Sequence, residues 1–454
     1  MSFVIVRSSR HCNIRRMVRG VRLGAVLVSA LSCACASAGG VPDRTAIDAA
    51  LRARINHGIR VSGTEAMPPG MTFDDGLAAD EAVSVALWNN PSFQVTLADL
   101  GFARADLIEA GQLRNPILSL LFPWGPKQFE STLQLPLEAI WQRPRRVKAA
   151  KLDAEVLAAR LMSDGLGVMA QARAAYLDAS AAEARLGLAR ESADLWGRLR
   201  SVADARLREG DISQFEARAV RSEAAMADAV TQGADGDREL ARIQLDAVLG
   251  ATVPAGSALT PVDDLPVSQC QALDALLTDA LASRPDVRAA ELAVEAAGAR
   301  VGLERSKILT LTATLDANGE GKQGFELGPG LGLDLPLNGN AGPRARASAA
   351  LTQASLRYLS VQAAVRVELR NGVARVTRAR EVLRVWDDQV IESLQIEGQQ
   401  AEKAYQAGET PLYTMLDTSR RLVTARRARL DARVDLLNAA IALDRAIGRS
   451  CAFR

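Results

Sequence analysis

The stretch Ser131-Thr132-Leu133-Gln134-Leu135-Pro136-Leu137 decides the fold, because it joins a strand pattern directly to a helix pattern. Its first five residues alternate polar and apolar side chains, which predicts a strand with one apolar face. After it comes a proline-free segment, about 145–207, that is rich in Ala, Arg, Glu and Leu. This composition predicts one long helix, although Gly165 and Gly167 weaken the pattern in its middle. About 60 helical residues would span roughly 90 Å, far more than a globular core needs.

The same pattern occurs a second time along the chain at a nearly constant spacing. Leu135-Pro136-Leu137 recurs 200 residues later at 335–337, and the helix start at 86–91 recurs 194 residues later at 280–285. Arg208-Glu209-Gly210-Asp211 matches Gln406-Ala407-Gly408-Glu409, and Leu249-Gly250 matches Ile447-Gly448, both 198 residues apart. Ordered matches of this kind predict two copies of one module of about 200 residues. The predicted organisation is a signal peptide at 1–38, an extended segment at 39–73, repeat 1 at 74–262, repeat 2 at 263–450 and a tail at 451–454.

Each repeat is predicted to contain a helix, two strands, a long helix, a tight turn and a returning helix. A helix is expected to run through the proline signals at Pro91 and Pro285. The expected strand pairs are 116–121 with 131–135, and 309–315 with 330–335. Their alternation suits a barrel hairpin that faces lipid, and it equally suits a soluble hairpin packed on a helix. The second long helix is expected at about 344–405, and the returning helices, of about 37 residues, are expected to end at Gly250 and Gly448.

The N-terminus carries the pattern of a secretory signal. Six arginines precede an apolar run at 23–31, and Ala36-Ser37-Ala38 fits a cleavage site. Cys33 offers an alternative, in which a lipoprotein signal is cut before it and the cysteine is acylated. Translation from Met17 would give a signal of more ordinary length. In an oxidising compartment, Cys270 and Cys451 could form a disulfide or remain unpaired.

Composition excludes several classes of function. The 454 residues include 55 basic and 53 acidic ones, so nothing favours nucleic acid as a partner. Only two histidines occur, and the sequence has no phosphate loop, Ser-His-Asp set or Cys/His cluster. We therefore expect no catalytic residues, no metal site, no cofactor and no enzymatic activity. No stretch has the eighteen or more apolar residues of a spanning helix, so membrane crossing would require strands that close into a barrel.

These pieces, in this order and twice over, resemble the TolC or outer-membrane factor family across residues 74–450. The resemblance rests on the Ala-Leu-x-x-x-Pro helix start, on Leu-Pro-Leu before an Arg-rich helix start, and on the Gly turn followed by an acid. It implies a mainly α fold with a membrane β part and a homotrimer whose four strands per subunit close a twelve-stranded barrel in lipid. Long helices would form a tunnel across the periplasm of a Gram-negative bacterium, below its outer membrane.

The resemblance also implies a function. Such channels work in tripartite efflux systems with a periplasmic adaptor and an inner-membrane pump, here expected to be of the RND type, and export small solutes such as heavy-metal cations or drugs. The Gly-Asp-Ile-Ser tip and the Ala-rich helices resemble the CzcC-like heavy-metal group most. A coiled-coil structural protein of the envelope is the alternative, although it would need neither paired strands nor an export signal.

The family's functional residues map onto the two turns and the helix after the second turn. Adaptor docking is expected at Arg208, Gly210, Asp211, Ser213, Gly408, Glu409, Thr410 and Pro411. A pore constriction is expected at Asp417, nine residues after Gly408. Thr414 occupies the other position that is often acidic, which departs from a gate with two acidic rings. Asp417 could instead be a solvated residue near Arg420 and Arg421, which could pair across helices.

Overall fold

The computed structural model describes residues 42–63, 65, 67–122, 124, 129–266, 272–307, 309–319, 325–334, 337–407 and 409–449. The predicted signal peptide and tail, together with Cys33, Cys270 and Gly408, lie outside these residues. The described residues form two compact units. The sheet unit contains Ala103–Lys151 and Ala299–Ala347, and the helical unit contains Pro42–Phe102, Leu152–Gly298 and Ser348–Arg454. Within the described ranges, no helix has the length and apolar character needed to cross a membrane.

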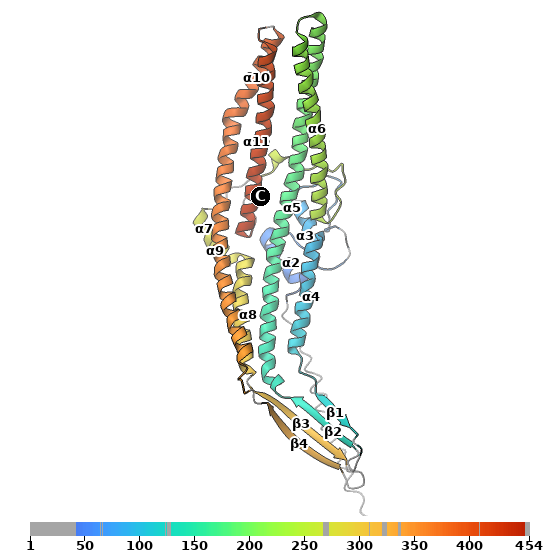
Figure 1. Cartoon of the computed structure of the whole chain (residues 1–454), viewed down its shortest axis with the longest axis vertical. Coiled ribbons are helices and arrows are strands. Elements are labelled where there is room, and N and C mark those ends of the chain that lie inside the picture. Colours follow the sequence, from blue (N-terminus) through green and yellow to red (C-terminus); the bar gives the residue numbers. More distant parts are fainter. Residues whose placement is uncertain are drawn as a thin grey trace, which may run out of the picture. The chain divides into compact units, whose positions relative to one another are not determined.

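The elements follow one order twice, as the colours of Figure 1 show: two helices, two strands, a long helix and a returning helix. After α2 (Arg44–Ile55), the first set is α3 (Ala79–Asn89), α4 (Pro91–Gly111), β1 (Ile117–Leu121), β2 (Phe129–Pro136), α5 (Glu138–Glu209) and α6 (Gln214–Leu249). A short 3-10 turn at Val262–Asp264 precedes the second set. That set is α7 (Leu273–Ser283), α8 (Pro285–Ser306), β3 (Thr310–Gly319), β4 (Phe325–Asp334), α9 (Ala341–Val385), α10 (Glu392–Gln406) and α11 (Leu412–Ile447).

The four strands form one antiparallel sheet in the order β1-β2-β3-β4. Its register places Leu118, Leu133, Leu315 and Pro329 in one row across the sheet. Because neighbouring residues of a strand point to opposite faces, every second row shares this face. We call it the apolar sheet face; its other members include Leu120, Phe129, Ser131, Leu135, Leu311, Ala313, Ala317, Gly319, Leu327, Leu331 and Leu333.

The opposite face of the sheet is mainly polar. It carries Ser119, Glu130, Thr132, Gln134, Thr310, Thr312, Thr314, Asp316, Asn318, Glu326 and Asp334, with Ile117, Leu121 and Pro136. The predicted alternation is therefore confirmed in β2, β3 and β4, whereas β1 has apolar residues on both faces. The strands β2, β3 and β4 are longer than the sequence predicted, because the ladder continues to Phe129 and Pro136 in β2, to Gly319 in β3 and to Phe325 in β4.

The first long helix begins earlier than predicted and has no interruption. α5 runs for 72 residues, includes Pro144 in its second turn and passes through Gly165 and Gly167. At this position proline removes one backbone hydrogen bond and crowds the carbonyl four residues before it, yet the helix continues through Pro144. Close packing explains the glycine at position 165, because an added Cβ would lie 3.0 Å from the side chain of Leu51 on α2.

The second long helix was predicted over about 344–405, and the structure is helical over this range, with one irregular turn. The turn Trp386–Ile391 between α9 and α10 is π-helical. A π-turn inserts an extra residue and shifts the faces of the helix on either side of it. Asp387 in this turn accepts a hydrogen bond from Arg429 of α11 at 2.7 Å.

The expected helix through each proline signal is instead two helices in both halves of the chain. Asn90 separates α3 from α4, and its side-chain amide donates to the carbonyl of Val248 at 2.8 Å. Arg284 separates α7 from α8 and donates to the carbonyl of Ala446 at 2.7 Å. The proline disfavours helical backbone at the residue before it. That residue then satisfies a carbonyl at the end of the returning helix.

The segment 39–73 was expected to be extended, but it contains α2. Asp43 caps this helix by accepting a hydrogen bond from the N–H of Ala46 at 2.9 Å. Ile47, Leu51 and Ile55, four residues apart, are buried in the main core of the helical unit. The helix therefore owes its stability to this apolar stripe more than to its polar, arginine-containing composition.

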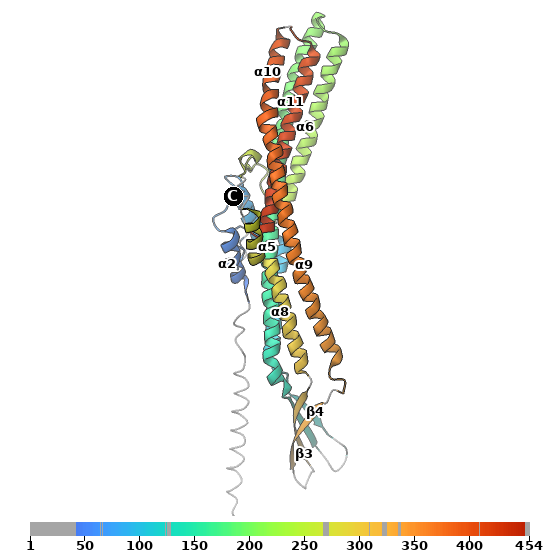
Figure 2. The same cartoon turned by 90° about the vertical axis from the view of Figure 1, so that its left-hand side faces the viewer.

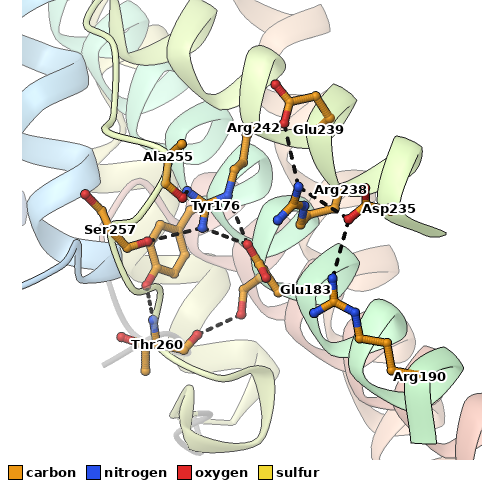
Figure 3. A network of polar contacts seen from close by, with 11 residues as sticks. Tyr176, Glu183, Arg190, Asp235, Arg238, Glu239, Arg242, Ala255, Ser257 and Thr260 are labelled. Atoms are coloured by element: carbon orange, nitrogen blue, oxygen red, sulfur yellow. Dashed lines mark hydrogen bonds and ion pairs between the residues drawn. The ribbon is translucent and has the colours of Figure 1, made fainter. Parts of the chain in front are cut away.

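A polar network fastens the segment after α6 to α5 (Figure 3). Arg242 of α6 donates to Glu183 of α5 at 2.7 Å and to the carbonyls of Ala255 and Ser257 at 3.0 and 3.1 Å. The hydroxyl of Tyr176, which is fully buried, accepts from the N–H of Thr260 at 2.7 Å. These contacts satisfy two carbonyls and one N–H of the segment after α6, which forms no regular helix or strand of its own there.

Candidate functional site

The predicted first tip closes the α5–α6 hairpin with a left-handed glycine. Gly210 has φ +82°, and its N–H donates to the carbonyl of Leu207 at 3.2 Å. The N–H of Asp211 reaches back to the carbonyl of Arg206 at 2.9 Å. The side chains of Arg208 and Asp211 are exposed at this turn. The predicted need for glycine is thus confirmed at Gly210.

Ser213 starts α6 as predicted, through a reciprocal cap. Its hydroxyl accepts from the N–H of Glu216 at 3.2 Å, while the Glu216 carboxylate accepts from the N–H and the hydroxyl of Ser213, both at 2.8 Å. The hydrogen bond from the Ser213 N–H, followed by that from its hydroxyl, lowers the pKa of Glu216. Both bonds favour the charged carboxylate. The whole cap satisfies two N–H groups at the helix start, those of Ser213 and Glu216.

The second tip lies between α10 and α11. The N–H of Ala407 donates to the carbonyl of Lys403 at 3.0 Å, and that of Glu409 to the carbonyl of Ala404 at 2.8 Å. Pro411 occupies the cap position of α11 with extended backbone, which confirms the predicted helix start. Glu409 and Pro411 are exposed, whereas Thr410 is half-buried.

The ends of the two hairpins pack against each other, and both views show α6, α10 and α11 at one end of the helical unit (Figures 1 and 2). The guanidinium of Arg206 lies 4.5 Å from the ring centroid of Tyr405, a cation–π contact between the hairpins. Tyr405 also belongs to an apolar cluster between the hairpins, whose other members are Trp196, Ala203, Val220, Ala224, Ala227, Met415 and Leu416. Sequence reasoning missed Arg206, because nothing in its local pattern identifies a partner 199 residues away.

The predicted constriction residues lie on α11 just after the second tip, Thr414 in its first turn and Asp417 in its second. Asp417 is half-buried and Thr414 is exposed. Arg420 pairs with Glu223 of α6, and Arg421 pairs with Glu397 of α10 at 2.9 Å. The expected pairing of these arginines across helices is therefore present. The hydrogen bond that Arg420 donates to Glu223 is the main favourable contact that raises the pKa of Arg420, and Asp417 adds a smaller attraction.

Metal binding finds no support in the part of the chain that the structure describes. No group of three or more His, Cys, Asp or Glu residues is placed there to hold an ion. Three acidic residues of the hairpin helices have other partners: Glu223 and Glu397 pair with arginines, and Glu216 takes part in a helix cap.

Comparison with known sequences finds similar proteins that are named for efflux or metal resistance. The family model described as outer membrane efflux protein matches residues 276–449. The chain is 25% identical over 380 residues to the cobalt-zinc-cadmium resistance protein CzcC of Cupriavidus metallidurans, covering 82% of this chain and 90% of the relative. It is 27% identical over 403 residues to the toluene efflux pump outer membrane protein TtgF of Pseudomonas putida, covering 81% and 82%.

Solved structures share the fold at lower sequence identity. CusC, described as a transmembrane channel, superposes with a TM-score of 0.70 at 18% identity, over 86% of this chain and 98% of its own. The open-state MtrE outer membrane channel of Neisseria gonorrhoeae superposes with a TM-score of 0.69 at 17% identity, over 86% and 98%. The family match and the curated relatives agree that the chain is similar to outer membrane efflux proteins, and the solved structures show that it shares their fold.

Proposed function

We propose that this protein is the outer-membrane channel of a tripartite efflux system. The observation that carries the proposal is the four-stranded sheet, with its apolar face and its two outer strands. In the described residues, β1 and β4 each pair with one strand only. A sheet edge in lipid leaves N–H and C=O groups that nothing can satisfy, so the edges require other strands.

Closure by further copies of the chain satisfies these edges. Strand β4 of one copy pairs with β1 of the next, and three copies complete a barrel of twelve strands, the number that the family resemblance implies. The apolar sheet face then meets outer-membrane lipid, and the polar face lines the interior. The long helices of the three copies form the periplasmic tunnel, and the two repeats place equivalent helices around it.

The rival, a coiled-coil structural protein without a channel, has no use for this sheet. Cross-linking of purified outer membranes, with native mass spectrometry of the extracted protein, separates the two. The channel is expected as a trimer in the outer-membrane fraction. A stable monomer in the soluble fraction would rule out the channel.

The cargo and the partners follow from the same proposal. One relative is named for cobalt, zinc and cadmium and another for toluene, so we propose small solutes, heavy-metal cations or drugs, as the exported class. A periplasmic adaptor docks on the two tips, and an inner-membrane pump of the RND type supplies the energy. The exposed turns at Arg208–Ser213 and Glu409–Pro411 are the surfaces offered to the adaptor.

Replacing Gly210 by valine is expected to abolish export while the trimer remains in the outer membrane. A β-branched residue at φ +82° costs on the order of 1–2 kcal/mol, which distorts the tip without unfolding a large protein. Nothing lies within 4 Å of an added Cβ, so the effect comes from the backbone alone. The measurement is cell survival under the exported toxicant, together with trimer content of the membrane. Gly408→Val is expected to behave in the same way.

Gly210→Asn serves as the matched control, because asparagine tolerates left-handed backbone far better than valine. It is expected to retain most of the export. Loss of the trimer in Gly210→Val would instead assign the glycine a role in folding.

Three copies of Asp417 are proposed to form an acidic constriction at the periplasmic end of the tunnel. Like charges in a narrow pore attract cations and bind passing divalent ions. Asp417→Ala is therefore expected to lower cation selectivity in planar bilayers and to relieve block by divalent cations added on the periplasmic side. Asp435→Ala, on an exposed part of the same helix, is the control and is expected to change neither. Unchanged selectivity and block in Asp417→Ala would remove Asp417 from the constriction.

A further inference from the structure

A cavity of about 650 Å³ opens in the helical unit, away from both tips. Four segments line it: the middle of α5, the break between α7 and α8, α9, and the last turns of α11. Small residues such as Ala170, Gly372 and Ala442 form part of its wall, which leaves the space open. Its volume falls within the range of about 300–1,000 Å³ that is typical of sites for small molecules.

The two acidic residues of the cavity share one arginine, which offsets one of their two negative charges. Arg284 donates to both carboxylate oxygens of Asp286, at 2.9 and 2.7 Å, and to Glu368 at 2.8 Å. It also donates to the carbonyl of Ala446 at 2.7 Å. This arginine therefore connects the α7–α8 break to α9 and α11 through hydrogen bonds, and these bonds hold one side of the cavity in place.

Two other arginines of the lining have their donors free. Arg375 of α9 and Arg445 of α11 both line the cavity, and within the described ranges neither has a carboxylate at ion-pair distance. The side-chain amides of Gln171, Asn371 and Asn438 also line it, and in the same ranges they make no hydrogen bond to the protein. The free groups at the cavity are thus mainly N–H donors, and its uncompensated charge is positive.

We propose that this cavity binds a small dianion that carries carboxylate or phosphate groups. Each guanidinium presents several N–H donors in a planar fork, which matches the two oxygens of a carboxylate or phosphate. Because Arg375 and Arg445 come from different helices, a molecule with two acidic groups can engage both. The amides supply further donors for its remaining oxygens. The site goes beyond the proposed export function, because binding here does not depend on an adaptor, a pump or a barrel.

The test is calorimetric titration of the full-length protein in detergent with succinate, inorganic phosphate and succinamide, at low ionic strength. Succinate is expected to bind, and its neutral diamide succinamide is not. Arg375→Gln and Arg445→Gln are each expected to weaken succinate binding about tenfold or more, since each removes charge-assisted hydrogen bonds. Added salt is expected to weaken the binding further. If phosphate bound as tightly as succinate, the cavity would be a site for a single anion, and the proposed molecule with two acidic groups would be wrong.

Arg366→Gln is the matched control. Arg366 is exposed on the same helix, nine residues or two and a half turns before Arg375, so it points to the opposite side. This variant is expected to bind succinate as the unaltered protein does. Circular dichroism and trimer content check that each variant is folded. Equal binding of succinate and succinamide, or equal losses in all three variants, would overturn the proposal, as would no binding of either anion.

Discussion

Asp444→Ala is expected to lower the free energy of unfolding of the helical unit by about 3 kcal/mol. Asp444 of α11 pairs with Arg173 of α5 at 3.0 Å, and their side chains are 0% and 3% exposed. Removing the carboxylate leaves a guanidinium in the core, where it cannot regain its hydration. Arg173 keeps a second partner, Asp80, at 3.2 Å, which places the loss at the lower end of the range for broken buried pairs. Guanidinium chloride unfolding, followed by circular dichroism, measures the shift.

The same two helices provide the control. Arg185 of α5 and Asp431 of α11 also pair, at 2.8 Å, but with side chains 37% and 47% exposed. Asp431→Ala is therefore expected to cost less than about 1 kcal/mol. A double variant, Arg173→Met with Asp444→Leu, removes both charges and is expected to recover most of the stability. Equal shifts in Asp444→Ala and Asp431→Ala would show that burial does not set the strength of these pairs.

The turns and helix ends could be predicted from the sequence because their causes are local. The left-handed backbone at Gly210 and the cap at Ser213 depend on neighbours within a few residues. The returning helices, predicted at about 37 residues, have 36 each and end at Gly250 and Gly448 in left-handed conformation. Strand alternation has a similarly short period, so it also marked the two faces of the sheet.

Features that depend on distant parts of the chain could not be predicted in this way. The π-turn at Trp386–Ile391 contains no proline or glycine, so nothing in the sequence marks it. The contacts of Arg206 with Tyr405 and of Arg420 with Glu223 join the two hairpins, across 199 and 197 residues. Only the packing of one hairpin on the other selects these partners from the many charges on each helix. The helix α2 was missed for the same reason, because its apolar stripe is short and gains stability from the core that receives it.

Leu315→Arg is expected to remove the trimer from the outer membrane. Leu315 lies near the middle of β3, on the apolar sheet face, between Leu133 and Pro329. In the proposed barrel this face meets lipid, where an arginine near the bilayer midplane costs about 2–4 kcal/mol. Three copies raise the cost to roughly 6–12 kcal/mol for each trimer, which is comparable to the whole stability of many folded domains.

The neighbouring residue separates this effect from simple disruption of the strand. Thr314 precedes Leu315 in β3 and is likewise paired on both sides, with Gln134 and Gly330. Its side chain belongs to the polar face. Thr314→Arg adds the same side chain one residue away, and it is expected to leave the trimer in place because that face lines the interior. Heat-resistant trimer on gels of outer-membrane fractions is the measurement for both variants. Should Leu315→Arg assemble as well as Thr314→Arg, the apolar sheet face would not meet lipid, and the proposed channel would lose the observation that carries it.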